Sequence, residues 1–322
     1  MFRAAAVAAI LFVLAQAAPS RPPVLGVAHV RLMASDLAQA RRFYRDLLGL
    51  PEVPQAAPNV AIFRVNDRQR VIVRAPLPAD RDDRFVDVAF ETTDIPDMRR
   101  ELSSKGFEGR DAEDAGEGEG QALETADPDG HRVRLIKLTA GPMINEGVDR
   151  RISRRILHIG LTIRDAAAAD RFYKDALGFS EIWRGGRPEG VTNWINMRVP
   201  EGTDYLEYML TATPPDRRQL GTAHHIALLV PDIQAALETL RARTADGDPN
   251  HRAVPQIGVN RRWQLNLYDP DGTRIEFMEP WTVRLPSRQR SSTHVARAPD
   301  APVDAQRPVP CSSSTIVWMS GW

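Results

Sequence analysis

Four short apolar segments in the second half of the chain each carry one side chain that can bind a metal ion. These side chains are His158, Glu207, His225 and Glu276. The intervals between them are 49, 18 and 51 residues. A short interval between two long ones is what two similar half-domains would give. We therefore predict that each half contributes one ligand from its first strand and another from its last.

The residues around each candidate ligand alternate as they do in a strand. Successive side chains of a strand point to opposite faces of the sheet. Leu157, Ile159 and Leu161 therefore lie opposite His158, and apolar residues flank the other three candidates in the same way. We expect the apolar faces to pack on helices and the four candidate ligands to share the concave face.

Paired histidine and carboxylate ligands suit a borderline divalent ion, here Zn, Ni, Co, Mn or Fe(II). Four protein ligands on an octahedral ion leave two adjacent positions for oxygens of a substrate. The ion would then act as a Lewis acid on a carbonyl and stabilise an enediolate. Glu207 or Glu276 could serve as general base for the proton alpha to that carbonyl. Taken singly, a strand histidine is more often structural and a strand glutamate is usually solvated. The agreement of spacing and facing favours a metal site.

The chain contains an internal repeat with an offset of 129 residues. His29 and Asp36 correspond to His158 and Asp165, and an Arg-Phe-Tyr stretch follows each pair. An Asp-Pro-Asp-Gly sequence also occurs twice, at 127–130 and 269–272. We predict a first domain at 24–138 and a second at 156–283, joined by a linker at 139–155.

Each repeat itself divides into two similar units. In the second repeat, a strand at 156–163 is followed by a helix with Asp165 as N-cap and Gly178 at its end. Strands near 192–199 and 204–210 follow, and a strand at 223–230 leads to a second helix. The pattern is one strand, one helix and three strands, twice per domain. It predicts an α+β fold in which two βαβββ modules form a cup-shaped mixed sheet.

The Phe-Tyr-x-Asp-x-Leu-Gly stretches at 43–49 and 172–178 and the two Asp-Pro-Asp-Gly turns resemble the vicinal oxygen chelate (VOC) superfamily. This family includes glyoxalase I, methylmalonyl-CoA epimerase, fosfomycin and bleomycin resistance proteins and extradiol dioxygenases. The resemblance covers residues 24–283 and implies tandem VOC domains. It also implies one divalent metal ion inside the cup, held by residues of the first and last strands of each module. The four candidate ligands fall on those positions.

The first domain departs from this pattern. His29 occupies the position of the first ligand, but the strand at 70–74 has no carboxylate. Asp87 and Arg134 stand where the second histidine and the last glutamate would be. Because an arginine in the cup repels a cation, we expect a degenerate, metal-free domain that is structural or shapes the pocket. A metal site formed by His29, Asp87 and His131 is the alternative.

His224 adjoins His225 but has the opposite parity in the strand. It is therefore expected to point away from the cup and to have a structural role. Residues Arg184, Arg187, Arg261 and Arg262 could bind an anionic group, although solvated surface charge is the commoner role of such residues.

Three functions are compatible with these features. The first is lyase or isomerase chemistry of the glyoxalase I type, favoured by Glu207, because extradiol dioxygenases lack a ligand on that strand. The second is an Fe(II) extradiol ring-cleaving dioxygenase, favoured by a degenerate domain followed by a metal-bearing one. Against it, Asn266 stands where the resemblance places a tyrosine, and no histidine occurs near Leu210. The third is a non-catalytic small-molecule binding or resistance protein, with Trp183, Trp194 and Trp263 lining an apolar pocket.

Composition limits the partners and the compartment. The 322 residues include 42 basic and 42 acidic side chains without a basic face, which argues against nucleic acid. Residues 1–20 resemble a signal peptide, with Arg3, an apolar run at 4–14 and a small-x-small site at 15–17. An uncleaved anchor is the alternative. We expect an exported protein, periplasmic or secreted, without stable membrane insertion after signal cleavage.

Export disfavours glutathione and coenzyme A as substrates, so we expect glyoxalase I-like chemistry on another small, oxygen-rich molecule. The only cysteine, Cys311, lies in a tail at 284–322 that is expected to be disordered. A homodimer is possible, although the tandem copy could replace the second subunit.

Overall fold

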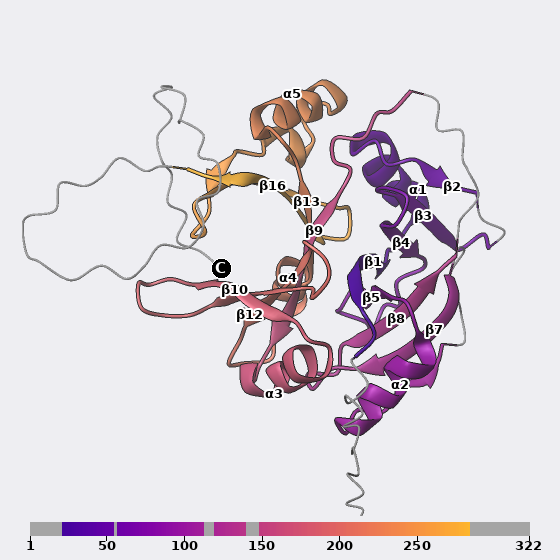
Figure 1. Ribbon diagram of the computed structural model, residues 1–322. Coiled ribbons are helices and arrows are strands. Elements are labelled where there is room, and N and C mark those ends of the chain that lie inside the picture. Colours follow the sequence, from indigo (N-terminus) through magenta and orange to yellow (C-terminus); the bar gives the residue numbers. More distant parts are fainter. Residues whose placement is uncertain (1–20, 55–56, 113–118, 140–147, 284–322) are drawn as a thin grey trace, which may run out of the picture.

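The computed structural model describes residues 21–54, 57–112, 119–139 and 148–283. The predicted signal peptide and the predicted disordered tail with Cys311 lie outside these residues. The described chain forms two eight-stranded mixed sheets with helices against them, which lie side by side with β1 next to β9 (Figure 1). The predicted α+β fold, with two similar domains in tandem, is confirmed.

The first sheet has the strand order β2-β3-β4-β1-β5-β8-β7-β6. Its strands are β1 (Val24–Met33), β2 (Glu52–Val53), β3 (Val60–Arg64), β4 (Arg70–Arg74), β5 (Phe85–Thr92), β6 (Arg110–Asp111), β7 (Glu119–Ala126) and β8 (Arg132–Leu138). Its helices are α1 (Leu37–Arg41), which continues as the wider π-helical turn η1 (Arg42–Leu47), and α2 (Ile95–Ser104).

The second sheet repeats this order as β10-β11-β12-β9-β13-β16-β15-β14. Its strands are β9 (Ile156–Ile163), β10 (Ser180–Gly185), β11 (Trp194–Arg198), β12 (Tyr205–Leu210), β13 (His225–Leu229), β14 (Gln256–Ile257), β15 (Arg262–Tyr268) and β16 (Arg274–Thr282). Its helices are α3 (Ala166–Asp170) with the π-helical turn η2 (Arg171–Ala176), α4 (Arg217–Ala223), α5 (Ile233–Arg243) and the 3-10 helix η3 (Pro249–Arg252).

The centre of each sheet places the first strands of its two modules side by side. In the second sheet β9 and β13 are antiparallel, and each has the last strand of its own module, β12 or β16, as a parallel neighbour. The four strands that carry the candidate ligands are therefore adjacent. The sequence predicted this because each module contributes its first and last strands to the site.

Local sequence signals account for where the helices of the second domain begin and end. Asp165 caps α3 by accepting from the backbone N–H groups of Ala167 and Ala168, and Asp232 caps α5 in the same way. Gly178 ends the first helix with a φ of 78°, a left-handed conformation that glycine adopts without steric cost.

The sequence reasoning missed α4, the short helix that leads directly into the strand of His225. Its signal is a capping box: the Asp216 side chain accepts from the Gln219 backbone, and the Gln219 side chain accepts from the Asp216 backbone. A helix of seven residues with one buried glycine has too little apolar periodicity to be recognised otherwise.

The two domains share one continuous apolar core, and the two duplicated motifs contact each other across it. Phe107 of the first domain packs edge-on against Phe172 of the second, with ring centroids 4.9 Å apart. The Tyr44 hydroxyl donates to Asp269 at 2.9 Å, and the Tyr173 hydroxyl donates to Asp127 at 3.0 Å. The helix tyrosine of each domain is thus hydrogen-bonded to the Asp-Pro-Asp-Gly turn of the other.

None of the helices in the described part of the chain combines the length and apolar composition needed to cross a bilayer.

Asp269 gives a pH-dependent test of this domain interface. Burial raises the pKa of its carboxyl from 3.8 to about 6, although Tyr44 and the backbone N–H groups of Asp271 and Thr273 donate to it. The folded state holds this proton more tightly than the unfolded state. Its stabilising effect is therefore complete below pH 3.8 and is lost as the pH rises through about 6.

We predict that the wild-type protein loses about 2 kcal/mol of unfolding free energy relative to Asp269→Asn between about pH 4 and pH 7. Urea unfolding of both proteins across this range measures the difference. A difference that stays constant with pH would show that Asp269 does not titrate in this way.

Candidate metal centre

The four predicted ligands lie on the four central strands of the second sheet. His158 is on β9, Glu207 on β12, His225 on β13 and Glu276 on β16. Their exposed fractions are 0, 8, 1 and 3%, so all four are removed from bulk water. Two carboxylates and two imidazoles buried together without a counter-charge would be costly, because burial penalises unpaired charge.

The side chains converge on one point. The Nε2 atoms of His158 and His225 are 2.9 Å apart, and a Glu276 carboxylate oxygen lies 3.5 Å from His158 Nε2 and 3.6 Å from His225 Nε2. A Glu207 carboxylate oxygen lies 3.8 and 3.5 Å from the same nitrogens. His158, His225 and Glu276 form the tightest group, with ligand atoms within 4.8 Å of one another.

These distances fit a single divalent ion. Ligand atoms about 2.1 Å from one ion are about 3.0 Å apart at right angles and about 3.4 Å apart at the tetrahedral angle. The two nitrogens and two carboxylates have the chemistry expected for Zn, Mn or Fe(II). The structure thus brings the four residues together in a metal-compatible arrangement, and their role as ligands stays a prediction.

Neighbouring groups fix the orientation of both imidazoles. The ring of Tyr205 stacks on His158 with centroids 4.5 Å apart. His225 Nδ1 lies 2.9 Å from the carbonyl oxygen of Ala223, the last residue of α4. When Nδ1 donates to that carbonyl, the lone pair of Nε2 is directed into the cup, which is the usual support of a metal-bound histidine.

Gly160 supplies the space that His225 needs. Its Cα faces His225 across the β9–β13 pair, and a Cβ at this position would lie 2.1 Å from the His225 ring and 2.6 Å from the Ala223 carbonyl oxygen. Any other residue at position 160 would displace the imidazole.

Burial and charge shift the titration of the cluster. Burial, with the nearby charge of Arg274, lowers the pKa of His225 well below 6.5, so its imidazole is neutral and able to bind metal. Burial, with the charge of Glu276, raises the pKa of Glu207. Although burial opposes it, contact with His158 and the charge of Arg274 lower the pKa of Glu276.

Three further polar residues lie on the same face. The sequence pointed to the position of Asn266, where the resemblance places a tyrosine, but not to Asn196 or Arg274. Asn196 pairs with Glu207 across β11–β12, and Asn266 pairs with Glu276 across β15–β16. The carboxamide oxygens of both are buried without a hydrogen-bond partner among the described residues. Arg274 lies two residues before Glu276 and therefore on the same face of β16. Alternation along the strand was the available signal for Arg274.

His224 is not part of the ligand cluster: it is the C-cap residue of α4 and contacts the first domain. Its Nε2 is 3.0 Å from the Thr162 hydroxyl and its Nδ1 is 2.9 Å from an Asp83 carboxylate oxygen. Asp83 belongs to the first domain, so His224 contributes to the contact between the domains.

Of the four arginines considered as anion ligands, Arg184 forms an exposed ion pair with Glu181, and Arg261 donates to the carbonyl of Val283. These contacts fit the surface role. The three tryptophans Trp183, Trp194 and Trp263 are partly buried, and Trp263 packs on the core.

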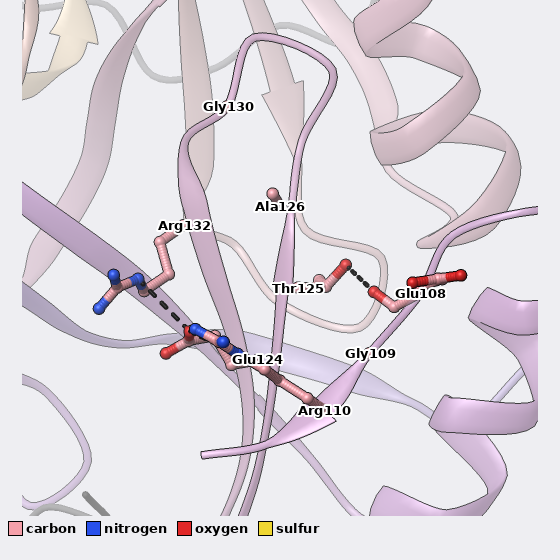
Figure 2. Close-up of a pocket in the computed structure, with 8 residues that line it drawn as sticks. All are labelled: Glu108, Gly109, Arg110, Glu124, Thr125, Ala126, Gly130 and Arg132. Carbon is pink, nitrogen blue, oxygen red and sulfur yellow. Dashed lines mark hydrogen bonds and ion pairs between the residues drawn. The ribbon is translucent and has the colours of Figure 1, made fainter. Parts of the chain in front are cut away.

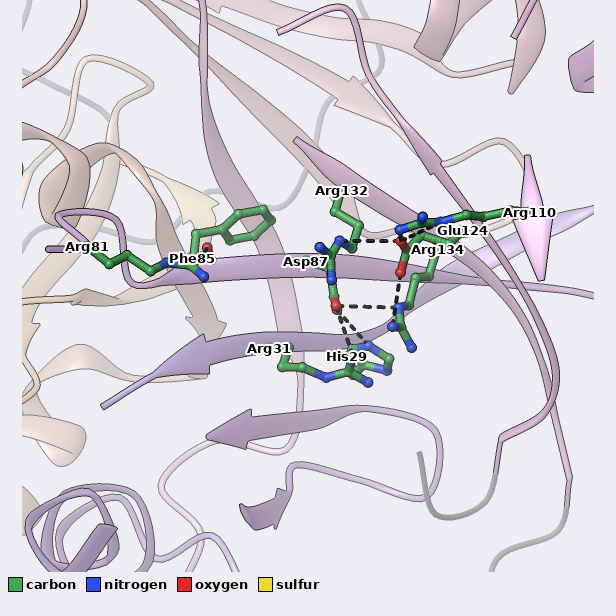
Figure 3. A network of polar contacts seen from close by, with 9 residues as sticks. All are labelled: His29, Arg31, Arg81, Phe85, Asp87, Arg110, Glu124, Arg132 and Arg134. Atoms are coloured by element: carbon green, nitrogen blue, oxygen red, sulfur yellow. Dashed lines mark hydrogen bonds and ion pairs between the residues drawn. The ribbon is translucent and has the colours of Figure 1, made fainter. Parts of the chain in front are cut away.

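The equivalent face of the first domain holds a network of ion pairs in place of a metal cluster (Figure 3). Asp87 accepts from His29 at 3.0 Å and from Arg31 at 2.9 Å, and Arg134 Nε lies 3.4 Å from it. Arg134 also pairs with Glu124 at 3.0 Å. Although burial opposes it, the hydrogen bond from His29 and the charges of the surrounding cations lower the pKa of Asp87.

Arg134 takes the place that Glu276 has in the second domain. Arg134 is paired with Ala89 in the first sheet, and Glu276 is paired with Ala227 at the same point of the second. The Arg134 guanidinium thus places a positive charge where the second domain has the Glu276 carboxylate. His131 does not join this network, because it contacts Asp127 at 2.9 Å and Thr162 at 3.3 Å. The alternative site of His29, Asp87 and His131 is therefore wrong.

A cavity of about 320 Å³ lies beside β6, β7 and β8 of the first domain (Figure 2). It is lined by Glu108, Gly109, Arg110, Glu124, Thr125, Ala126, Gly130 and Arg132. None of the four predicted ligands lines it, and three of its charged side chains are already paired: Arg110 lies 2.5 Å and Arg132 3.5 Å from a Glu124 oxygen. The side-chain cluster of the second domain therefore locates the candidate chemistry better than this cavity does.

The protein thus consists of two domains, each built from a pair of βαβββ modules, and the second domain contains a cluster of two histidines and two glutamates. The family model of the Glyoxalase/Bleomycin resistance protein/Dioxygenase superfamily matches residues 26–135 and 155–277. The chain belongs to this superfamily.

Two similar proteins match different shares of the chain. A lactoylglutathione lyase of Haemophilus influenzae is 33% identical over 127 residues, which is 39% of this chain and 92% of that protein. A manganese-dependent 2,3-dihydroxybiphenyl 1,2-dioxygenase of Geobacillus genomosp. 3 is 22% identical over 286 residues, 78% of this chain and 89% of that protein.

Solved structures with this fold include two dioxygenases. The 2,3-dioxygenase LapB from Pseudomonas sp. KL28 has a TM-score of 0.62 and 18% identity, covering 81% of this chain and 93% of that one. Homoprotocatechuate 2,3-dioxygenase from Arthrobacter globiformis has a TM-score of 0.63 and 21% identity, covering 81% and 82%. At these identities the likeness establishes the two-domain fold alone.

The space around Gly160 provides a test of the site that leaves every ligand in place. We predict that Gly160→Ala lowers the affinity for Mn²⁺ by at least about tenfold, because the added methyl group displaces His225. Titration calorimetry with Mn²⁺ measures this. Gly247→Ala is the control, since a Cβ at Gly247 meets nothing within 4 Å. Unchanged Mn²⁺ affinity in a folded Gly160→Ala protein would contradict the site.

Proposed function

We propose that the protein is a metal-dependent enzyme of the glyoxalase I type, which removes a proton next to a metal-chelated carbonyl. The observation that supports this most is the presence of two carboxylates, Glu207 and Glu276, beside His158 and His225. A divalent ion held by these residues would polarise the carbonyl oxygen of a small substrate that chelates it through two neighbouring oxygens.

The residues of this chain divide into two roles. His158, His225 and Glu276 are the closest group and hold the ion. Glu207 is the general base: its side chain is 10% exposed against 4% for Glu276, and it lies further from His158. Burial raises the pKa of Glu207, which makes it a stronger base for a carbon-bound proton.

The remaining polar residues of the cup orient the substrate. The carboxamides of Asn196 and Asn266 flank the two glutamates, and their oxygens have no protein partner among the described residues. Hydroxyl groups of a bound substrate would satisfy these acceptors. Because the site is removed from water, the polar groups of the cup interact more strongly with the negative charge that develops on the substrate oxygen.

A ring-cleaving dioxygenase is the second candidate. Its support is the coverage of both domains by dioxygenase relatives, one of them named as manganese-dependent. Two residues favour the first candidate. Glu207 lies on a strand where extradiol dioxygenases have no ligand, and Asn266 stands where the resemblance places a tyrosine, although its carboxamide cannot act as an acid or a base.

Substitution of the two glutamates tests the division of roles. We predict that Glu207→Gln keeps one Mn²⁺ per chain but exchanges the alpha proton at least about 100-fold more slowly, whereas Glu276→Gln loses the ion. The measurement is deuterium incorporation in D₂O by proton NMR, with hydroxyacetone and S-lactoylglutathione as probes.

Glu181→Gln, on the outer strand β10, is the matched control and should exchange like the wild type. Absence of exchange in the metal-loaded wild-type protein, together with oxygen uptake on catechol, would contradict the proposal and favour the dioxygenase. Exchange at the wild-type rate in Glu207→Gln would remove Glu207 from its role.

A further inference from the structure

The cup of the second domain contains a cation that the predicted ligand set does not use. Arg274 follows the Asp-Pro-Asp-Gly turn and is partly buried on the face of Glu276. It forms no ion pair with a carboxylate among the described residues, and its Nε atom is buried without a hydrogen-bond partner. A guanidinium in such surroundings is normally paired, because it presents five donors in a rigid fork that matches a carboxylate.

The one side-chain hydrogen bond that Arg274 forms within the described residues conflicts with the metal-binding form of His225. Arg274 Nη2 lies 2.8 Å from His225 Nδ1, and Nδ1 also lies 2.9 Å from the Ala223 carbonyl oxygen. A single ring nitrogen cannot accept from the guanidinium and donate to the carbonyl at once. When Nε2 binds an ion, Nδ1 carries the proton and donates to Ala223. The guanidinium of Arg274 then has its donors available to a ligand.

The sum of the charges in the cup also favours an anionic ligand. Glu207 and Glu276 together balance one divalent ion, and both histidines are neutral when they bind it. Arg274 therefore leaves one positive charge in a site removed from water. Such a site favours a ligand that brings one negative charge with its chelating oxygens, because an unpaired buried charge is costly.

We propose that Arg274 selects ligands of the α-hydroxy acid class, in which a carboxylate adjoins the hydroxyl that chelates the metal. One carboxylate oxygen and the hydroxyl would chelate the ion, and the second carboxylate oxygen would accept from the Arg274 guanidinium. Arg274 is thus a specificity-determining residue. The inference rests on the proposed metal site but goes beyond it by naming the charge of the ligand.

Two small probes that differ in charge test this assignment. In the full-length Mn²⁺-loaded protein, the affinity for glycolate is compared with that for hydroxyacetone, a neutral α-hydroxyketone, through the water-proton relaxation of Mn²⁺. Arg274→Gln should weaken glycolate binding about tenfold, while hydroxyacetone binding changes less than twofold. Arg274→Lys, which keeps the charge, should retain most of the preference for glycolate.

Arg184→Gln is the matched control, because Arg184 is exposed and paired with Glu181 on an outer strand. It should bind both probes like the wild type. Equal weakening of both probes in Arg274→Gln, or no change in glycolate binding, would overturn the role of Arg274. The Mn²⁺ affinity of the wild type is measured first: a protein that binds no Mn²⁺ refutes the metal site itself, whereas bound Mn²⁺ without charge selectivity refutes Arg274 alone.

Discussion

The burial of like charges in a small concave space is the constraint on which this structure depends. Glu207 and Glu276 lie within 4 Å of the same two imidazole nitrogens, and all four side chains are withdrawn from water. Such a group is stable only with a compensating positive charge, because desolvation penalises each carboxylate. The first domain meets the same constraint with Arg31 and Arg134 around Asp87. The two cups of the duplicated scaffold thus differ in their charge: two arginines surround one carboxylate in the first, whereas in the second two carboxylates face a single arginine, Arg274, and we propose that a bound cation balances them.

The duplication also explains how the site is held. The four ligand strands are adjacent because each sheet joins two modules through their first strands, with their last strands as parallel neighbours. The Tyr44–Asp269 and Tyr173–Asp127 hydrogen bonds connect each domain to the other at the turn that precedes its last strand. The first domain thereby supports β16, the strand of Glu276 and Arg274, although it contributes no candidate ligand.

The fold and the positions of the four cluster residues could be predicted because both leave a pattern in the sequence. The repeat with an offset of 129 residues predicted the pair of domains, and alternation along each strand predicted the face on which each side chain lies. The helix α4 was missed because seven residues with a capping box carry little periodicity, so the Ala223 carbonyl that orients His225 was missed with it. That Asn196 and Asn266 lie opposite the two glutamates could not be found from the sequence, since it depends on strand register. The ion pairs of Arg184 and Asp87 likewise depend on which side chains meet in three dimensions.

The most direct test of the account is the metal content of the purified full-length protein and of its His158→Ala variant, after both are exposed to equal Mn²⁺ and desalted. His158 is fully buried, and its Nε2 lies within 4 Å of the other three side chains, so its loss removes the central ligand. The account predicts one ion per chain in the wild type and none in a folded His158→Ala protein. One ion per chain in both would contradict it.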